Sequence, residues 1–129
     1  NWQIGIDKPV DDPVNESAEI QTIISVTNVG LTTSGNYRQF YFRDGKKFAH
    51  TIDPRTGKPV DHNMLSATVV APDCMTADAY ATAFMVLGID SAMKICDEID
   101  GLDCYLIYSD EKGEFKTTQT KGFEKYLQK

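Results

Sequence analysis

The strongest constraint on the fold is a predicted strand that leads almost directly into a predicted helix. Met64–Ala71 is rich in β-branched and apolar residues, and Pro72-Asp73 ends this run. A stretch of helical composition follows over Met75–Leu87, and Gly88 ends it. Because nearly every position of this stretch is apolar or small, we expect most of the helix circumference to be buried.

Several shorter segments carry strand or helix patterns. A second amphipathic helix is predicted from Ser91 to about Ile99, capped by Asp90, and a helical end is predicted from Gly122. The polar segment Gly30–Gly35 reads as a turn. Because the elements mix without a regular β-α-β alternation and short turns join several strands, we predict an α+β fold with a mixed, largely antiparallel sheet and two or three helices. The predicted strands are residues 2–6, 19–28, 37–42, 47–50, 64–71, 104–108 and 114–118.

The size and the charge of the chain narrow the possible functions. Its 129 residues correspond to one ordinary domain. The net charge is −6 and the basic residues are scattered along the sequence, so we expect no nucleic-acid partner. An acidic protein can still bind a phosphate group if a divalent cation supplies the local positive charge.

Asp78 and Thr82 lie one helical turn apart within the predicted helix Met75–Leu87 and therefore share a face. A carboxylate on a helix that is mostly buried needs a partner, because an unpaired buried charge costs several kcal/mol. A carboxylate and a hydroxyl oxygen together suit Mg²⁺. In the alternative interpretation, Asp78 complements the helix N-terminus behind a Thr76 cap, and the Thr82 hydroxyl bonds back to a backbone carbonyl.

His50 comes directly before a turn that Pro54 and Gly57 are suited to form. An imidazole changes charge near neutral pH and can accept a proton from an attacking hydroxyl within hydrogen-bond reach. The alternative is a structural or exposed histidine beside an ordinary hairpin turn. Arg55 and Arg38 are candidates for contact with phosphate or with a protein partner, although either can be an ordinary surface charge.

These segments resemble the signatures of the C-terminal half of the ApbE family, the FAD:protein FMN transferases. The His50–Pro59 block and Asp78-Ala79-Tyr80-Ala81-Thr82, which fits D-A-x-x-T, carry the resemblance. Order and spacing also agree in four further segments: Trp2-x-Ile4-Gly5-Ile6, Ser34-Gly35-x-Tyr37, Ala71-Pro72 and Val86-Leu87-Gly88. The resemblance implies that residues 1–129 form the C-terminal portion of an ApbE-like flavin transferase domain whose N-terminal half is absent.

The resemblance also implies an activity and roles for single residues. The parent enzyme would bind FAD as a substrate together with Mg²⁺. A threonine hydroxyl of an acceptor protein, such as a redox-pump subunit, would attack the flavin-side phosphorus, so that FMN becomes linked to the acceptor and AMP leaves. By this resemblance Asp78 and Thr82 match the metal ligands and His50 the catalytic base, while Ile52 lies in the segment that packs near the flavin. A core strand residue is the alternative for Ile52.

The same resemblance implies a location in the cell and leaves alternative activities open. The family resemblance implies the bacterial periplasm or cell envelope, with a membrane anchor through an N-terminal lipid upstream of this chain. Some relatives hydrolyse FAD to FMN and AMP, so an FAD pyrophosphatase is one alternative. A non-catalytic flavin-binding module is another, since Ala81 and Gln39 depart from the pattern of some relatives. A purely structural domain is the third.

Overall fold

A computed structural model describes residues 1–9, 19–35, 40–43, 46–49, 51–60 and 62–128, with the strands at 40–43 and 46–49 described by their backbone pairing. The elements within these ranges follow one another in the order β1 (Trp2–Asp7), β2 (Ile20–Val26), β3 (Gly30–Gly35), β4 (Phe40–Arg43), β5 (Lys46–Ala49), β6 (Ile52–Asp53), β7 (Lys58–Pro59), β8 (Met64–Ala71), α1 (Cys74–Leu87), α2 (Ile89–Glu98), β9 (Asp103–Ser109), β10 (Phe115–Gln119) and the 3-10 helix η1 (Lys121–Tyr126).

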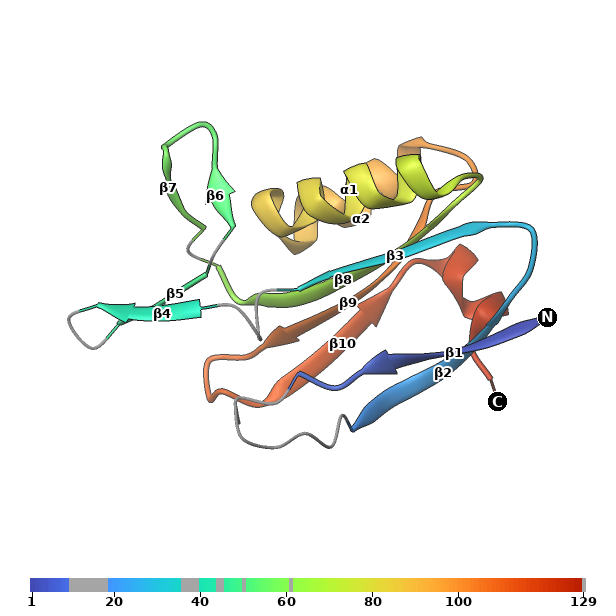
Figure 1. Cartoon of the computed structure of the whole chain (residues 1–129), viewed down its shortest axis with the longest axis horizontal. Coiled ribbons are helices and arrows are strands. Elements are labelled where there is room, and N and C mark those ends of the chain that lie inside the picture. Colours follow the sequence, from blue (N-terminus) through green and yellow to red (C-terminus); the bar gives the residue numbers. More distant parts are fainter. Residues whose placement is uncertain (10–18, 36–39, 44–45, 50, 61, 129) are drawn as a thin grey trace.

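The central layer is a four-stranded sheet in the order β10-β9-β8-β3, and all of its neighbouring strands are antiparallel. Successive side chains of a strand point to opposite faces. Val69 accordingly packs toward α1 and α2, whereas Val70 packs toward the β1–β2 pair and η1. The helices thus cover one face of the sheet and β1, β2 and η1 lie on the other (Figure 1). This three-layer arrangement confirms the predicted α+β class with largely antiparallel strands.

The prediction that Gly30–Gly35 forms a turn is wrong, because this segment is strand β3 at the edge of the central sheet. It pairs with β8 over its whole length, from Gly30 opposite Ala71 to Gly35 opposite Ser66. A hydroxyl contact of 2.8 Å between Thr33 Oγ1 and Thr68 Oγ1 adds a cross-strand side-chain bond. A polar composition typical of a turn is therefore overridden by pairing with a strand more than thirty residues away.

Helix α1 begins one residue earlier than predicted and ends at Leu87, before Gly88, whose φ of 90° is unfavourable for other residues. It buries one side, formed by Ala77, Ala81, Phe84 and Met85. The prediction that most of its circumference is buried is wrong, because the opposite side is exposed. Small residues are present on both sides, so composition alone does not separate the buried from the exposed face.

Strand β3 packs along α1, and its first residue, Gly30, lies against the backbone at the start of the helix. A Cβ atom at Gly30 would overlap the carbonyl group of Asp73 and the backbone nitrogen of Cys74. The absence of a side chain at this position therefore lets the start of α1 lie against the start of β3. No helix within the described ranges is long and apolar enough to cross a bilayer.

Candidate functional site

The end of strand β3 meets the exposed side of α1 through two hydroxyl groups. Ser34 Oγ lies 3.4 Å from Thr82 Oγ1, and either oxygen can donate the hydrogen bond. The contact joins residues 48 positions apart in the sequence. It brings the Ser34-Gly35 segment and the Asp78-to-Thr82 segment, which are far apart in the sequence, to one location.

Asp78 lies one turn before Thr82 on α1 and is exposed. The expectation that Asp78 lies on a mostly buried helix is therefore wrong, and burial does not by itself require a partner for its carboxylate. Among the residues that the structure describes, no hydrogen bond or ion pair engages its carboxylate. Asp78 and Thr82 thus present a carboxylate and a hydroxyl to solvent on the same side of the helix.

The local structural role that the alternative interpretation gave to Asp78 belongs to another residue. Asp73 is the N-cap of α1, and its Oδ1 accepts a 2.8 Å hydrogen bond from the backbone N–H of Thr76. The Thr76 hydroxyl adds a 3.0 Å bond to Oδ2, and both bonds lower the pKa of the Asp73 carboxyl. Thr76 is therefore not the cap, and the first turn of α1 contains no acidic residue. The helix terminus does not explain Asp78.

The alternative role for Thr82 also differs from the observed contact. A threonine inside a helix commonly donates its hydroxyl to the carbonyl four residues earlier. Within the described part of the chain, the side-chain bond of Thr82 is instead the one to Ser34. Neither Asp78 nor Thr82 is committed to stabilising α1 through its side chain.

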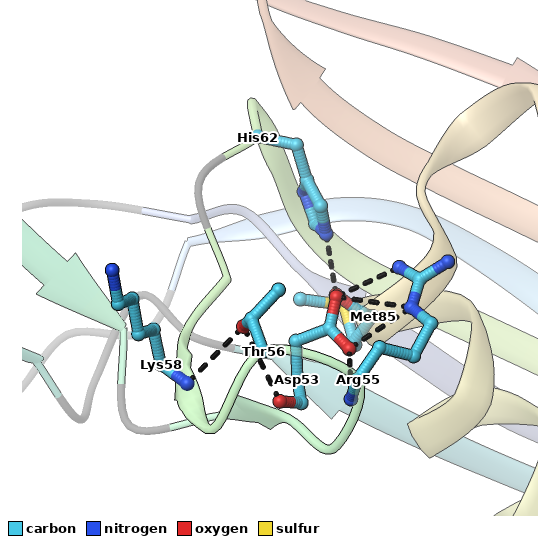
Figure 2. A network of polar contacts seen from close by, with 6 residues as sticks. All are labelled: Asp53, Arg55, Thr56, Lys58, His62 and Met85. Carbon is cyan, nitrogen blue, oxygen red and sulfur yellow. Dashed lines mark hydrogen bonds and ion pairs between the residues drawn. The ribbon is translucent and has the colours of Figure 1, made fainter.

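The segment after His50 forms the predicted turn, which connects β6 with β7. The backbone N–H groups of Thr56 and Gly57 donate to the Asp53 carbonyl at 3.2 and 2.8 Å, and Gly57 has a φ of 68°. The carboxylate of Asp53 faces Arg55, whose Nη2 donates at 2.7 Å and whose Nε donates at 3.0 and 3.2 Å. These side-chain hydrogen bonds lower the pKa of Asp53 and raise that of Arg55. Arg55 therefore stabilises the turn (Figure 2).

His62 joins this hairpin to α1. Its Nε2 lies 2.5 Å from the carbonyl oxygen of Met85, and its Nδ1 accepts a 3.2 Å bond from the backbone N–H of Met64. Because Nδ1 accepts, Nε2 carries the proton and donates to Met85 (Figure 2). No sequence signal marks this contact, since it spans 23 residues.

The His62 bond places the β6–β7 hairpin beside the C-terminal end of α1 (Figure 1). Thr82 lies in the C-terminal half of this helix, five residues before its last residue. Ile52, at the start of β6, is 49% exposed, so the alternative that it is a core strand residue is wrong. His50 and Arg38 lie outside the described residues. Their proposed roles, like the flavin contact of Ile52 and the phosphate contact of Arg55, stay predictions.

The chain offers hard oxygen donors but only part of a metal site. Among the described residues, no group of three or more His, Cys, Asp or Glu side chains lies close enough together to hold a metal ion. One carboxylate and one hydroxyl on a solvent-facing helix side can supply two of the six oxygen ligands that Mg²⁺ takes. Substrate phosphate, water and backbone carbonyls are suitable sources for the others.

Comparison with known proteins agrees with this architecture. The FAD:protein FMN transferase of Escherichia coli K12 is 40% identical over 126 residues, which are 98% of this chain and 34% of that protein. The transferase of Haemophilus influenzae is 41% identical over 124 residues, which are 96% of this chain and 34% of that protein. The chain therefore spans about a third of the length of the curated relatives it matches.

Solved structures show the same similarity in three dimensions. The flavin transferase ApbE from Vibrio cholerae aligns with a TM-score of 0.76 at 33% identity and covers 98% of this chain and 38% of that one. The flavinyl transferase ApbE of Pseudomonas stutzeri in its apo form gives a TM-score of 0.73 at 32% identity, over 98% of this chain and 36% of that one. The pattern described as the ApbE family matches residues 1–106. The chain belongs to the ApbE family.

Proposed function

We propose that the protein carrying this chain is a Mg²⁺-dependent FAD:protein FMN transferase that moves FMN from FAD to a threonine hydroxyl of an acceptor protein and releases AMP. The relatives of this name from Escherichia coli and Haemophilus influenzae match at least 96% of the chain at about 40% identity. The observation that carries the proposal is the solvent-facing pair of Asp78 and Thr82, which has no role in capping α1.

The donor chemistry of this pair fits Mg²⁺. Carboxylate and hydroxyl oxygens are ligands that Mg²⁺ accepts, and Asp78 has no competing partner among the described residues. When bound, the cation would neutralise negative charge on the pyrophosphate of FAD. Asp78 and Thr82 would hold it on the exposed side of the middle of α1, whose C-terminal end lies beside the hairpin that begins with Ile52.

The other residues of the proposed site would act on the two substrates. Ile52 presents a half-exposed apolar side chain against which a flavin ring can pack. His50 would accept the proton of the threonine hydroxyl while the threonine oxygen forms a bond to the flavin-side phosphorus. The bond from that phosphorus to the AMP oxygen breaks in the same transfer, and AMP leaves with the electron pair.

The substitution Asp78→Ala in the full-length gene product tests the metal assignment. We expect it to abolish Mg²⁺-dependent transfer of fluorescent flavin to an acceptor protein, detected as covalently bound flavin after denaturing electrophoresis. Asp97→Ala is the matched control, because it removes a carboxylate that is also exposed, but from α2. Transfer at the wild-type rate by the Asp78 variant would reject the role of Asp78.

The products distinguish the transferase from its alternatives. Formation of FMN and AMP without labelling of any acceptor threonine would make the protein an FAD pyrophosphatase. FAD binding without any AMP would make it a flavin-binding module. A transferase releases one AMP for each FMN attached to the acceptor.

We also propose that the protein acts in the bacterial periplasm or cell envelope, anchored through an N-terminal lipid, and that its acceptor is a redox-pump subunit. The family resemblance supports both statements. Fractionation of cells that express the full-length gene should recover the protein with the membranes, and detergent should release it. Recovery from the cytosol alone would contradict the proposed location.

A further inference from the structure

The hydroxyl of Thr82 needs a hydrogen-bond acceptor if its oxygen is to coordinate a cation. A threonine hydroxyl has one hydrogen and two lone pairs. When a hydroxyl oxygen coordinates a cation through a lone pair, its hydrogen must point away from the cation, toward an acceptor. Groups that hydrogen-bond to a metal ligand usually fix the orientation of that ligand. The contact that the structure gives Thr82 for this purpose is Ser34 Oγ at 3.4 Å.

The register of the sheet directs the side chain of Ser34 toward α1. Ser34 lies opposite Ala67 of β8, and residues directly opposite each other in an antiparallel pair share a face. Ala67 is fully buried in the core beneath α1, so Ser34 also faces this helix. The neighbouring Thr33 points to the other face, where it contacts Thr68. Ser34 is thus directed toward the helix by strand alternation and by the close approach at Gly30.

We propose that Ser34 is a positioning residue of the cation site, whose Oγ accepts the hydrogen bond of the Thr82 hydroxyl and so turns a lone pair of Thr82 toward Mg²⁺. This inference rests on the proposed function. At 3.4 Å the contact is longer than the about 2.7–2.8 Å of a typical hydroxyl hydrogen bond. A cation that withdraws charge from Thr82 Oγ1 makes its hydrogen a stronger donor. Cation binding and shortening of this contact therefore favour each other.

Direct measurement of cation affinity tests the role without relying on turnover. Mg²⁺ is titrated into the full-length gene product by calorimetry, with and without FAD. Ser34→Ala should weaken Mg²⁺ binding about tenfold, the lower end of the effect of removing a partner of a metal ligand. Ser34→Thr, which keeps the hydroxyl, should stay within about twofold of the wild type by the same reasoning.

Thr33→Val is the matched control. It removes a hydroxyl from the adjacent position of the same strand, but one that faces away from α1. This variant should lose some thermal stability and keep its Mg²⁺ affinity. Equal loss of affinity in the Thr33 and Ser34 variants would show a general effect on strand β3 and would overturn the positioning role.

The remaining outcomes separate this inference from the proposed function. If Asp78→Ala and Thr82→Ala weaken Mg²⁺ binding and Ser34→Ala does not, the role of Ser34 is wrong and the metal site stands. If none of the three weakens binding, or the wild type binds no Mg²⁺ with or without FAD, the metal site itself is wrong. Ser34→Cys distinguishes positioning from direct ligation, because a thiolate ligand prefers Cd²⁺. If Ser34→Cys increases the affinity for Cd²⁺ relative to that for Mg²⁺, residue 34 is a direct ligand and the positioning role is wrong.

Discussion

The close approach of β3 and α1 at Gly30 makes Gly30→Ala the most informative test of the fold. The added Cβ would overlap the backbone of Asp73 and Cys74, and backbone atoms cannot rotate out of the way as a flexible side chain can. Since carbon atoms pack at about 3.5–4.0 Å, the strand and the helix must separate by on the order of 1 Å. Overpacking of this kind costs about 1–3 kcal/mol of unfolding free energy.

Thermal unfolding of the full-length gene product measures this cost. Each kcal/mol lowers the unfolding midpoint by about 2–4 °C in a protein of 150–250 residues and by less in a longer one. Hydrogen exchange of peptides from β3 and the first turn of α1 should become faster, because the disturbance begins there. Mg²⁺ affinity should fall as well if the Ser34–Thr82 contact is stretched.

Gly113→Ala serves as the control for the Gly30 substitution. Gly113 has a φ of 79° and would place its Cβ in open space, so it tests backbone strain without steric overlap. Its effect should be confined to the turn before β10. Wild-type stability and wild-type exchange of β3 in the Gly30 variant would refute the claim that this glycine sets the distance between strand and helix.

Three further substitutions test single contacts. Ser66→Ala should leave the free energy of unfolding unchanged or raise it by up to about 1 kcal/mol, because Ser66 Oγ is buried without a hydrogen-bond partner among the described residues; a marked loss of stability would contradict this reasoning. Asp73→Ala should lower the thermal midpoint at neutral pH. Because hydrogen bonds from Thr76 hold the folded-state pKa of Asp73 below the unfolded value of 3.8, this contribution is present above about pH 4 and is lost as the pH falls through the lower folded-state pKa. A difference in midpoint between variant and wild type that stays constant from neutral to strongly acidic pH would contradict this reasoning. His62→Ala should lower the free energy of unfolding by about 0.5–1.5 kcal/mol through the lost bond to Met85, and it should speed hydrogen exchange of residues 51–60. Unchanged exchange there would refute the role of His62 in joining the β6–β7 hairpin to α1.

Sequence patterns predicted the elements whose causes are local. Strand β8 matches its predicted bounds, and α1 differs from its prediction by one residue at the N-terminus. The turn after Asp53 also forms as expected, because proline and glycine restrict or permit backbone angles wherever they occur. Strand β3 was missed because its polar residues become a strand through pairing with β8.

The candidate site likewise combines features that local sequence determines with contacts that depend on the tertiary structure. Sequence alone determined that Asp78 and Thr82 share one side of a helix, since a spacing of four residues produces that result in any α-helix. Tertiary structure decided that this side faces solvent, that Ser34 contacts Thr82, and that His62 ties the β6–β7 hairpin to the end of α1. These contacts depend on sheet register and on backbone approach between segments 23 to 48 residues apart. Propensity and spacing act within a few residues of the chain and carry no information about such distances.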